Sequence, residues 1–171
     1  MARLDRADYA QHNRLSKTER IRQVASSEVA IANLVYRYAE LIDSGDLEAT
    51  SRLFAHARVY MGPDLGEVGA DKVLELWRQS FIFYEGGSPR CKHVITNPII
   101  EVDEEAGRGT CRSYYTVMQQ AAGGPLEAVI CGRYHDEFER VDGAWRFSRR
   151  DYSLHDLPGD LSRHSHTFNA R

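Results

Sequence analysis

A predicted amphipathic helix ends in the sequence LVYRYAELIDSGD, residues 34–46. Its apolar residues recur at intervals of three and four, the period of a helix with one buried face. Gly45 stands where a glycine commonly ends a helix. Two polar side chains, Tyr38 and Asp43, lie within this apolar helix end. We expect both to face a pocket to which a later strand contributes His93.

Size, composition and charge exclude several classes of protein. The chain has 171 residues, 42% apolar and 27% charged, as expected for one globular domain. The formal net charge of −3 argues against nucleic acid as a partner, and no apolar run is long enough to predict a membrane span. The N-terminus lacks an apolar signal region, and an odd number of cysteines, three, favours free thiols. We therefore expect a cytoplasmic protein.

The hydrophobic pattern divides the chain into three parts. Residues 1–15 are expected to form a polar N-terminal arm. Residues 16–157 are expected to form a single α+β barrel domain, and residues 158–171 a polar tail that contains histidine but no clear element.

The hydrophobic period changes from that of helices to that of strands near residue 90. A capping box at Ser16–Glu19 predicts the start of the first helix, which continues, with a break near Ser26, to residue 44. We expect further helices at 46–55 and from 69 to the turn at 85–89, and strands at 58–62, 91–102, 109–120, 126–140 and 145–152.

This order of elements predicts an α+β fold. Pro98 interrupts the first long strand, which indicates a bulge and a strongly bent, mainly antiparallel sheet. Three N-terminal helices packed in the concave face of such a sheet make a cone. The cone has an apolar interior with one open mouth, a suitable place for a small-molecule partner.

Several short motifs, in this order and spacing, resemble the SnoaL-like group of the nuclear-transport-factor-2-like, or scytalone-dehydratase-like, superfamily. The resemblance covers roughly residues 26–152 and rests on Tyr38–Asp46, Leu53-Phe54, Cys91–Asn97, Gly132–Asp136 and Asp142–Phe147. This superfamily contains lyases, isomerases, cyclases and binding domains on one fold.

The resemblance implies catalytic roles for particular residues. In the dehydratase members a carboxylate at the end of the first helix works with a histidine on the first long strand, and these positions match Asp43 and His93. The spacing of Tyr38 and Asp43 is similar to that in bile-acid dehydratases, in which the tyrosine also acts. The further strand arginine of those enzymes has no secure match here.

The three residues suit the chemistry of dehydration next to a carbonyl group. Histidine can take the α-proton and return it to the leaving hydroxide, because its pKa lies near working pH. A carboxylate on the other ring nitrogen fixes the tautomer and stabilises the imidazolium. A tyrosine hydroxyl can donate to the developing enolate. His93, Asp43 and Tyr38 would supply these three groups.

Each of these residues also has a purely structural interpretation. His93 could be a core histidine bonded to a backbone carbonyl. Asp43 could accept hydrogen bonds from the following turn, although a carboxylate at a helix C-terminus is disfavoured by the helix dipole. Tyr38 lies five residues from Asp43, about 140° around an ideal helix, so packing is an equal alternative for it.

Seven further side chains are expected to shape the pocket and bind the substrate. Tyr134 is the preferred candidate among them, and only one of the neighbours Tyr114 and Tyr115 can point into the cone because successive strand residues face opposite ways. We expect neither a metal nor a cofactor, since His164 and His166 only loosely resemble a metal-binding pair. The predicted substrate-binding residues are Tyr134, Tyr60, Trp77, Phe81, Asn97, Tyr115 and Met118.

The first functional hypothesis is a cofactor-independent lyase, of the dehydratase or dehydrohalogenase type, for a small hydrophobic, cyclic substrate. One alternative is a ketosteroid-isomerase-like or polyketide-cyclase-like enzyme with Asp43 as the base. Another is a non-catalytic ligand-binding or assembly domain, such as the β subunit of a ring-hydroxylating dioxygenase. In each case the outer face of the sheet needs cover, which predicts a homodimer or homotrimer.

Overall fold

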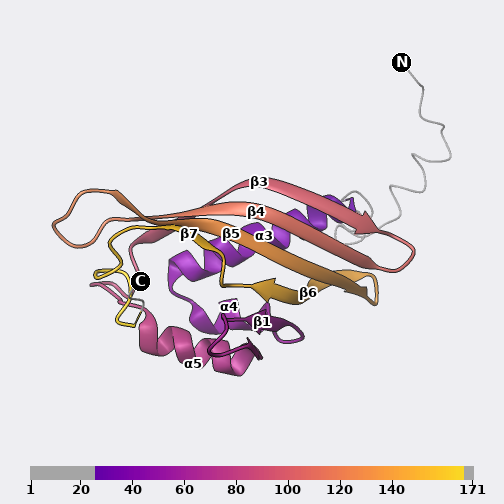
Figure 1. Cartoon of the computed structure of the whole chain (residues 1–171), viewed down its shortest axis with the longest axis horizontal. Helices are drawn as coiled ribbons and strands as arrows, with labels where there is room; N and C mark the ends of the chain where they lie inside the picture. The colour runs from indigo at the N-terminus through magenta and orange to yellow at the C-terminus, as the bar shows by residue number, and fades with distance from the viewer. Residues whose placement is uncertain (1–25, 168–171) are drawn as a thin grey trace, which may run out of the picture.

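The computed structural model describes residues 26–167, and its elements have the predicted α+β architecture (Figure 1). The predicted N-terminal arm and the capping box at Ser16–Glu19 lie outside the described residues. The helices are α3 (Ser27–Ser44), α4 (Leu47–Arg52) and α5 (Ala70–Ser80). The strands are β1 (Arg58–Tyr60), β2 (Glu67–Val68), β3 (Cys91–Asp103), β4 (Arg108–Gln119), β5 (Glu127–Val141), β6 (Ala144–Asp151) and β7 (His155–Pro158).

One seven-stranded sheet, mostly antiparallel, forms one side of the molecule. Its strand order is β2-β1-β6-β5-β4-β3, with β7 paired to β5. The four long strands form the predicted meander, and β1 joins β6 in parallel. Figure 1 shows α3 lying along the long strands, with α4 and α5 beyond it. The described residues therefore form the helix-filled cone that the sequence predicts.

Helix α3 begins and ends at positions that its sequence specifies. The hydroxyl of Ser26 accepts a hydrogen bond from the N–H of Val29, so the predicted break is the N-cap of α3. Gly45 ends the helix in the left-handed conformation, with φ of 82°. A Cβ at Gly45 would lie 2.8 Å from the carbonyl oxygen of Gly87, so the helix end packs closely against the segment before β3.

The bend in β3 occurs at the predicted place. The register between β3 and β4 shifts between Thr96 and Ile99, on either side of Pro98, and Asn97 has a positive φ of 53°. A bulge of this kind bends a strand and increases its twist.

The last predicted strand ends at residue 152 and the predicted polar tail begins at 158, but the structure has a further strand, β7, at His155–Pro158 and packs part of the tail against the core. Strand β7 pairs with β5, Leu161 is buried in the core, and Ser165 forms a bridge with Phe81. The bridge between Phe81 and Ser165 also explains why α5 ends at Ser80, before the predicted turn. The backbone of Phe81 is extended, and the N–H of Ile82 donates to the carbonyl of His164. Pairing between distant segments has no local sequence signal.

The core lies between the helices and the concave face of the sheet, and its fully buried side chains include Ile31, Ile42, Phe54, Phe138 and Phe147. The three cysteines are free thiols, as predicted. None of the described helices combines the length and the apolar character needed to cross a membrane.

Candidate functional site

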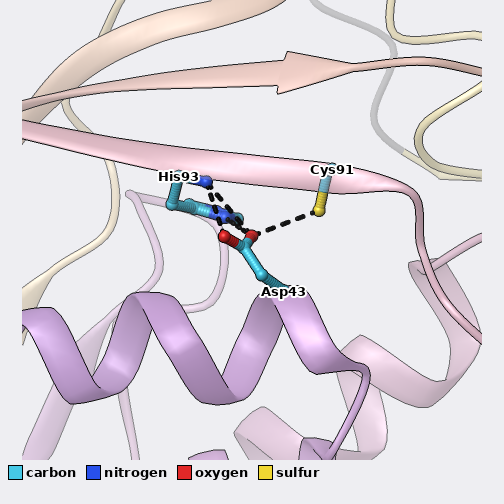
Figure 2. Close-up of side chains that lie close together, drawn as sticks. All are labelled: Asp43, Cys91 and His93. Carbon is cyan, nitrogen blue, oxygen red and sulfur yellow. Dashed lines mark hydrogen bonds and ion pairs between the residues drawn. The ribbon is translucent and has the colours of Figure 1, made fainter.

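Asp43 and His93, which are fifty residues apart, form a buried pair between α3 and β3 (Figure 2). Oδ1 of Asp43 lies 2.7 Å from Nδ1 of His93. The backbone N–H of His93 donates to the same carboxylate, at 2.9 Å to Oδ2 and 3.1 Å to Oδ1. The side chains of Asp43 and His93 are only 5% and 6% exposed. The structure thus brings together the two residues that the sequence predicts as partners.

Hydrogen bonds from β3 explain why a carboxylate is tolerated at the end of α3. Besides the two N–H groups of His93, the thiol of Cys91 donates to Oδ1 at 3.5 Å. The polar groups of the turn after the helix form hydrogen bonds that do not involve Asp43. The hydroxyl of Ser44 donates to the carbonyl of Leu41, and Asp46 caps α4. The alternative in which Asp43 only stabilises this turn is therefore not what the structure shows.

The contact with Asp43 fixes the orientation and tautomer of the His93 ring. A carboxylate can only accept, so Nδ1 carries the hydrogen and Nε2 carries the lone pair in neutral imidazole. Among the described residues, the hydrogen bonds of this side chain all go to Asp43. The ring of His93 lines a cavity. The arrangement therefore leaves the Nε2 lone pair without a partner among the described residues, on a ring that lines the cavity and whose other nitrogen contacts Asp43.

This cavity has a volume of about 130 Å³ and lies inside the cone. Six of its fifteen described lining residues are Tyr, Trp or Phe and three are His, and the titratable groups among these fifteen are tyrosines and histidines. It is lined by Tyr38, Met61, Leu76, Trp77, Ser80, Phe81, His93, Tyr115, Val117, Ile130, Tyr134, Tyr152, His155, His164 and Ser165.

Six of the ten predicted site residues line the cavity, and Asp43 stands apart from the wall. Asp43 contacts the wall residue His93, so any role it has is exercised through that ring. The six that reach the wall are Tyr38, His93, Trp77, Phe81, Tyr115 and Tyr134.

Tyr60, Asn97 and Met118 do not line the cavity. Strand alternation buries Tyr115 and Val117 on one face of β4, which places Met118 on the other. Asn97 is exposed at the bulge of β3. Tyr60 lies beside Arg149, whose guanidinium is 5.9 Å from the centre of its ring, and its neighbour Met61 reaches the cavity instead.

Tyr38 is buried at the wall with its hydroxyl bonded to that of Tyr152. Its ring meets the His93 ring edge-on, with centroids 6.0 Å apart. Burial raises the pKa of Tyr38 to about 12, so the hydroxyl remains protonated at neutral pH. Tyr38 can therefore act as a hydrogen-bond donor close to His93.

A second group of polar side chains stands on β4, β5 and β7. Tyr115 and Tyr134 stack face to face, with centroids 4.3 Å apart. The hydroxyl of Tyr115 lies 2.7 Å from Nδ1 of His155. Burial lowers the pKa of His155, so this histidine is held neutral on the cavity wall.

A fully buried ion pair packs against the rings of Tyr38 and Tyr134. Arg150 and Asp136 form two hydrogen bonds of 2.7 Å, and both side chains are 0% exposed. The guanidinium carbon of Arg150 lies 4.2 Å from the ring centres of both Tyr38 and Tyr134. The guanidinium attracts negative charge near the tyrosines, and the carboxylate of Asp136 paired with it opposes that effect.

Sequence reasoning missed Tyr152, His155, His164 and Arg150. Arg150 lies near the end of β6 and Tyr152 just beyond it, after a register shift that disturbs the alternation that would have revealed their orientation. The two histidines belong to the C-terminal segment, whose polar composition suggested no element. The histidines of this segment were its one sequence feature that pointed to a functional site.

The side chains of Asp43, Cys91 and His93 also lie close enough together to be considered as metal ligands, within 4.8 Å of one another. They do not fit that role well. Burial raises the pKa of the Cys91 thiol, which therefore stays protonated, whereas a metal needs the thiolate. The carboxylate already accepts hydrogen bonds from both partners. The donor set is explained by hydrogen bonding within the cluster.

The fold and site together define a class of protein: an α+β cone that encloses an aromatic cavity with a buried His–Asp pair. A model of the SnoaL-like domain matches residues 23–151. The chain therefore belongs to the SnoaL-like family, within the NTF2-like superfamily.

Solved structures with the same fold include three from Novosphingobium aromaticivorans. A proposed scytalone dehydratase is 23% identical, with a TM-score of 0.58 over 83% of this chain and 87% of that one. An NTF2-like protein with a cystatin-like fold is 22% identical, with a TM-score of 0.52 over 88% and 90%. The β subunit of a proposed aromatic-ring-hydroxylating dioxygenase is 19% identical, with a TM-score of 0.57 over 81% and 95%. None of the curated proteins matches the sequence closely enough to be called a relative.

Proposed function

We propose that this protein is a cofactor-independent lyase, of the dehydratase or dehydrohalogenase type, for a small hydrophobic, cyclic substrate. The observation that carries the proposal is the 2.7 Å contact between Asp43 and Nδ1 of His93, because it leaves Nε2 as a base on the wall of an aromatic cavity. The similarity to a proposed scytalone dehydratase agrees with this chemistry but shows only the fold.

The mechanism begins with proton abstraction by His93. Nε2 takes a proton from the carbon next to the substrate carbonyl, and the electron pair of that C–H bond moves into an enolate. Asp43 stabilises the imidazolium through Nδ1–H. Its carboxylate is a positioning group, since it does not line the cavity.

The developing negative charge lies on the carbonyl oxygen. Tyr38 donates a hydrogen bond to this oxygen, and its link to Tyr152 orients the hydroxyl. The guanidinium of Arg150 packs against the Tyr38 ring and attracts the same charge, an effect that its ion pair with Asp136 reduces. The wall of the cavity is mainly apolar, and low polarity around the reacting groups strengthens each of these interactions.

Elimination completes the reaction. The enolate electrons form a carbon–carbon double bond as the bond from the β-carbon to the leaving group breaks. In a dehydration the imidazolium of His93 returns its proton to the leaving hydroxide, which departs as water. In a dehydrohalogenation the halide leaves with its electron pair, and the proton passes from His93 to solvent.

The two alternatives are less well supported. An isomerase or cyclase with Asp43 as base needs the carboxylate on the cavity wall, whereas Asp43 is bonded to His93 and lies off the wall. A dioxygenase β subunit is favoured only by similarity of fold. Such a subunit needs no base directed into a cavity.

The proposal can be tested with β-hydroxycyclohexanone and β-chlorocyclohexanone as probes. Both would give cyclohexenone, whose conjugated carbonyl is followed by ultraviolet absorbance. The variant His93→Ala should lower the rate by about 10²- to 10⁴-fold, the usual contribution of a general base. His56→Ala is the matched control, since His56 is exposed and lies away from the cavity. Full activity of His93→Ala with an unchanged melting temperature would rule out this mechanism.

A further inference from the structure

The wall of the cavity contains a second hydrogen-bonded pair, Tyr115 and His155, for which the mechanism above has no role. Both residues line the cavity, and the hydroxyl oxygen of Tyr115 lies 2.7 Å from Nδ1 of His155. Tyr115 comes from β4 and His155 from β7, so the contact joins two separate strands. A tyrosine hydroxyl can donate one hydrogen bond and accept others. The contact with His155 therefore leaves Tyr115 able to bond to a ligand as well.

The position of the Tyr115 hydroxyl is set by the sheet. Gly132 on β5 lies between the two residues in the register, opposite Tyr115 on one side and His155 on the other. A Cβ at Gly132 would lie 2.6 Å from the Tyr115 hydroxyl, so the glycine leaves the space through which this side chain crosses β5. The Tyr115 ring also stacks on Tyr134, with centroids 4.3 Å apart. These contacts hold the hydroxyl without help from a mobile loop.

The pair lies beside the row of residues that contains His93. His93 is opposite Val117, and Val117 is opposite Ile130, so these three form one row across the concave face. Tyr115 and its partner His155 belong to the next row on the same face, about 7 Å along the strands. Val117 and Ile130 also line the cavity. A ring that rests on them has His93 at one end and the Tyr115–His155 pair at its side.

The small volume of the cavity brings the substituents of such a ring against the wall. The volume of about 130 Å³ is close to that of an engineered apolar cavity, about 150 Å³, that binds benzene. One six-membered ring fills this space. In a mainly apolar cavity, a polar substituent is stable only where a hydrogen-bonding group meets it. With the carbonyl oxygen at Tyr38, the Tyr115–His155 pair is available for the other polar substituent, the leaving group.

The chemistry of the pair favours a hydroxyl group over a halogen. Burial raises the pKa of Tyr115 and lowers that of His155, so both are neutral at pH 7. In one tautomer of His155, Nδ1–H donates to the tyrosine oxygen and the tyrosine O–H is left to donate. In the other, Tyr115 donates to Nδ1 and its oxygen is left to accept. A hydroxyl group fits both tautomers because it can accept and donate, whereas bound chlorine has no hydrogen to donate.

We propose that the Tyr115–His155 pair binds the leaving hydroxyl of the substrate, so that the protein is a dehydratase for β-hydroxy cyclic ketones rather than a dehydrohalogenase. The inference rests on the proposed function, from which it takes His93 as the base and Tyr38 as the donor to the carbonyl oxygen. Tyr115 donates a hydrogen bond to the β-oxygen while the carbon–oxygen bond breaks and its electron pair moves to that oxygen. The imidazolium of His93 supplies the proton that makes the leaving hydroxide water. Tyr115 keeps its own proton, and His155 is a positioning residue.

The two cyclohexanone probes test this role because they differ only in the leaving group. Tyr115→Phe keeps the aromatic ring and removes the hydroxyl. Its kcat for β-hydroxycyclohexanone should fall about five- to tenfold, the effect of one hydrogen bond, while kcat for β-chlorocyclohexanone stays nearly unchanged. His155→Leu should show the same selective loss, because the Tyr115 hydroxyl is no longer held. A purely structural role of either residue would slow both probes alike.

Tyr84→Phe is the matched control. The hydroxyl of Tyr84 also bonds to the C-terminal segment, at the carbonyl of Arg163, but Tyr84 is not among the residues that line the cavity. This variant should leave kcat for both probes unchanged. The proposal is overturned if Tyr115→Phe slows the two probes by the same factor, or slows neither.

Binding without turnover separates this proposal from the proposed function. In His93→Ala, which lacks the base, isothermal titration calorimetry compares β-hydroxycyclohexanone with cyclohexanone. The hydroxy compound should bind about five- to tenfold more tightly, and adding Tyr115→Phe should remove the difference. If the wild-type protein converts neither probe, this measurement decides. A difference that depends on Tyr115 would then disprove the lyase function and leave the hydroxyl site intact, and equal binding of the two compounds would overturn the site. Turnover of both probes without a selective loss in Tyr115→Phe would disprove the role of Tyr115 alone.

Discussion

At the scale of single residues, the Asp43–His93 pair combines a structural and a chemical role. The carboxylate accepts the backbone N–H of His93 as well as its ring N–H, so it ties α3 to β3 whatever the ring does. The chemical role depends only on the contact with Nδ1. A substitution that preserves the shape of the side chain can separate the two roles.

Asp43→Asn provides this separation. The amide keeps the size of the carboxylate but has no charge with which to stabilise imidazolium, and its NH₂ group can force the wrong tautomer of His93. We expect kcat for the cyclohexanone probes to fall by about 10²- to 10⁴-fold with little change in KM. The free energy of unfolding should fall by about 1–3 kcal/mol, as hydrogen bonds to a buried charge are lost. Equal losses in kcat and in substrate affinity would instead indicate a disrupted site.

His164 gives the protein a predictable dependence of stability on pH. Its folded-state pKa of about 4 lies below the value of 6.5 for an unperturbed histidine, so the unfolded chain binds more protons between these two values. Stability from this group is complete above pH 6.5 and is lost as the pH falls toward 4, by up to roughly 3 kcal/mol. Urea unfolding at several pH values should therefore show a shallower acid loss for His164→Asn than for His166→Asn. Identical curves for the two variants would contradict the burial of His164.

At the scale of elements, the end of α3 determines where Asp43 points. Gly45 combines a φ of 82° with a contact that leaves no space for a side chain, because an added Cβ would lie 2.9 Å from Cε1 of Phe83. Gly123 has a similar φ of 74°, but nothing lies within 4 Å of its added Cβ. These two glycines share the backbone strain and differ in the contact.

Gly45→Ala should therefore destabilise the protein more than Gly123→Ala. The backbone strain common to both costs about 1–2 kcal/mol, and the clash at Gly45 adds to it. Chemical denaturation of the two variants measures the difference. If both variants lose the same stability, the close approach of α3 to the segment before β3 is not important for the fold.

The elements that the sequence predicted correctly have strong local signals. Helix α3 has an apolar face, a serine cap and a terminal glycine, and β4 and the middle of β5 alternate between buried and less buried residues. The Asp43–His93 pair was found only because these signals matched a family pattern. Neither residue has a distinctive local sequence.

The elements and site residues that were missed depend on contacts between distant parts of the chain. Strand β7 has four residues and includes a proline, so only its pairing with β5 defines it. That pairing brings His155 to the cavity, whereas His164 is placed by the bridge between Ser165 and Phe81 and by the hydrogen bond from the N–H of Ile82 to its carbonyl. Met118 was misplaced because Tyr115 and Met118, three positions apart, cannot share a face of one strand.

At the scale of the whole molecule, an apolar group on the outer face of the sheet is exposed within residues 26–167. Tyr114 is 54% exposed and Ile99 53%, on neighbouring strands, and Val94 is 45% exposed on the same strand as Ile99. An apolar group of this kind on a sheet commonly marks an interface. We propose that a second copy of the chain covers it, in a homodimer or homotrimer.

Size-exclusion chromatography with light scattering tests this proposal. The wild-type protein should have a mass two or three times that of the 19.5 kDa chain. Tyr114→Glu should reduce the mass to that of a monomer by placing a charge in the interface. Leu65→Glu, at an exposed residue on the turn before β2, should not. A monomeric wild-type protein would contradict the proposal.

The proposed mechanism requires that Nε2 of His93 be a base directed into the cavity. Proton exchange measures this most directly, because it requires no leaving group. Cyclohexanone in D₂O should exchange its α-protons for deuterium faster in the presence of the wild-type protein than in buffer, as followed by proton NMR. The account predicts that His93→Ala reduces this exchange to the buffer rate while His56→Ala does not. Exchange that persists in His93→Ala, or is absent from the wild-type protein, would contradict it.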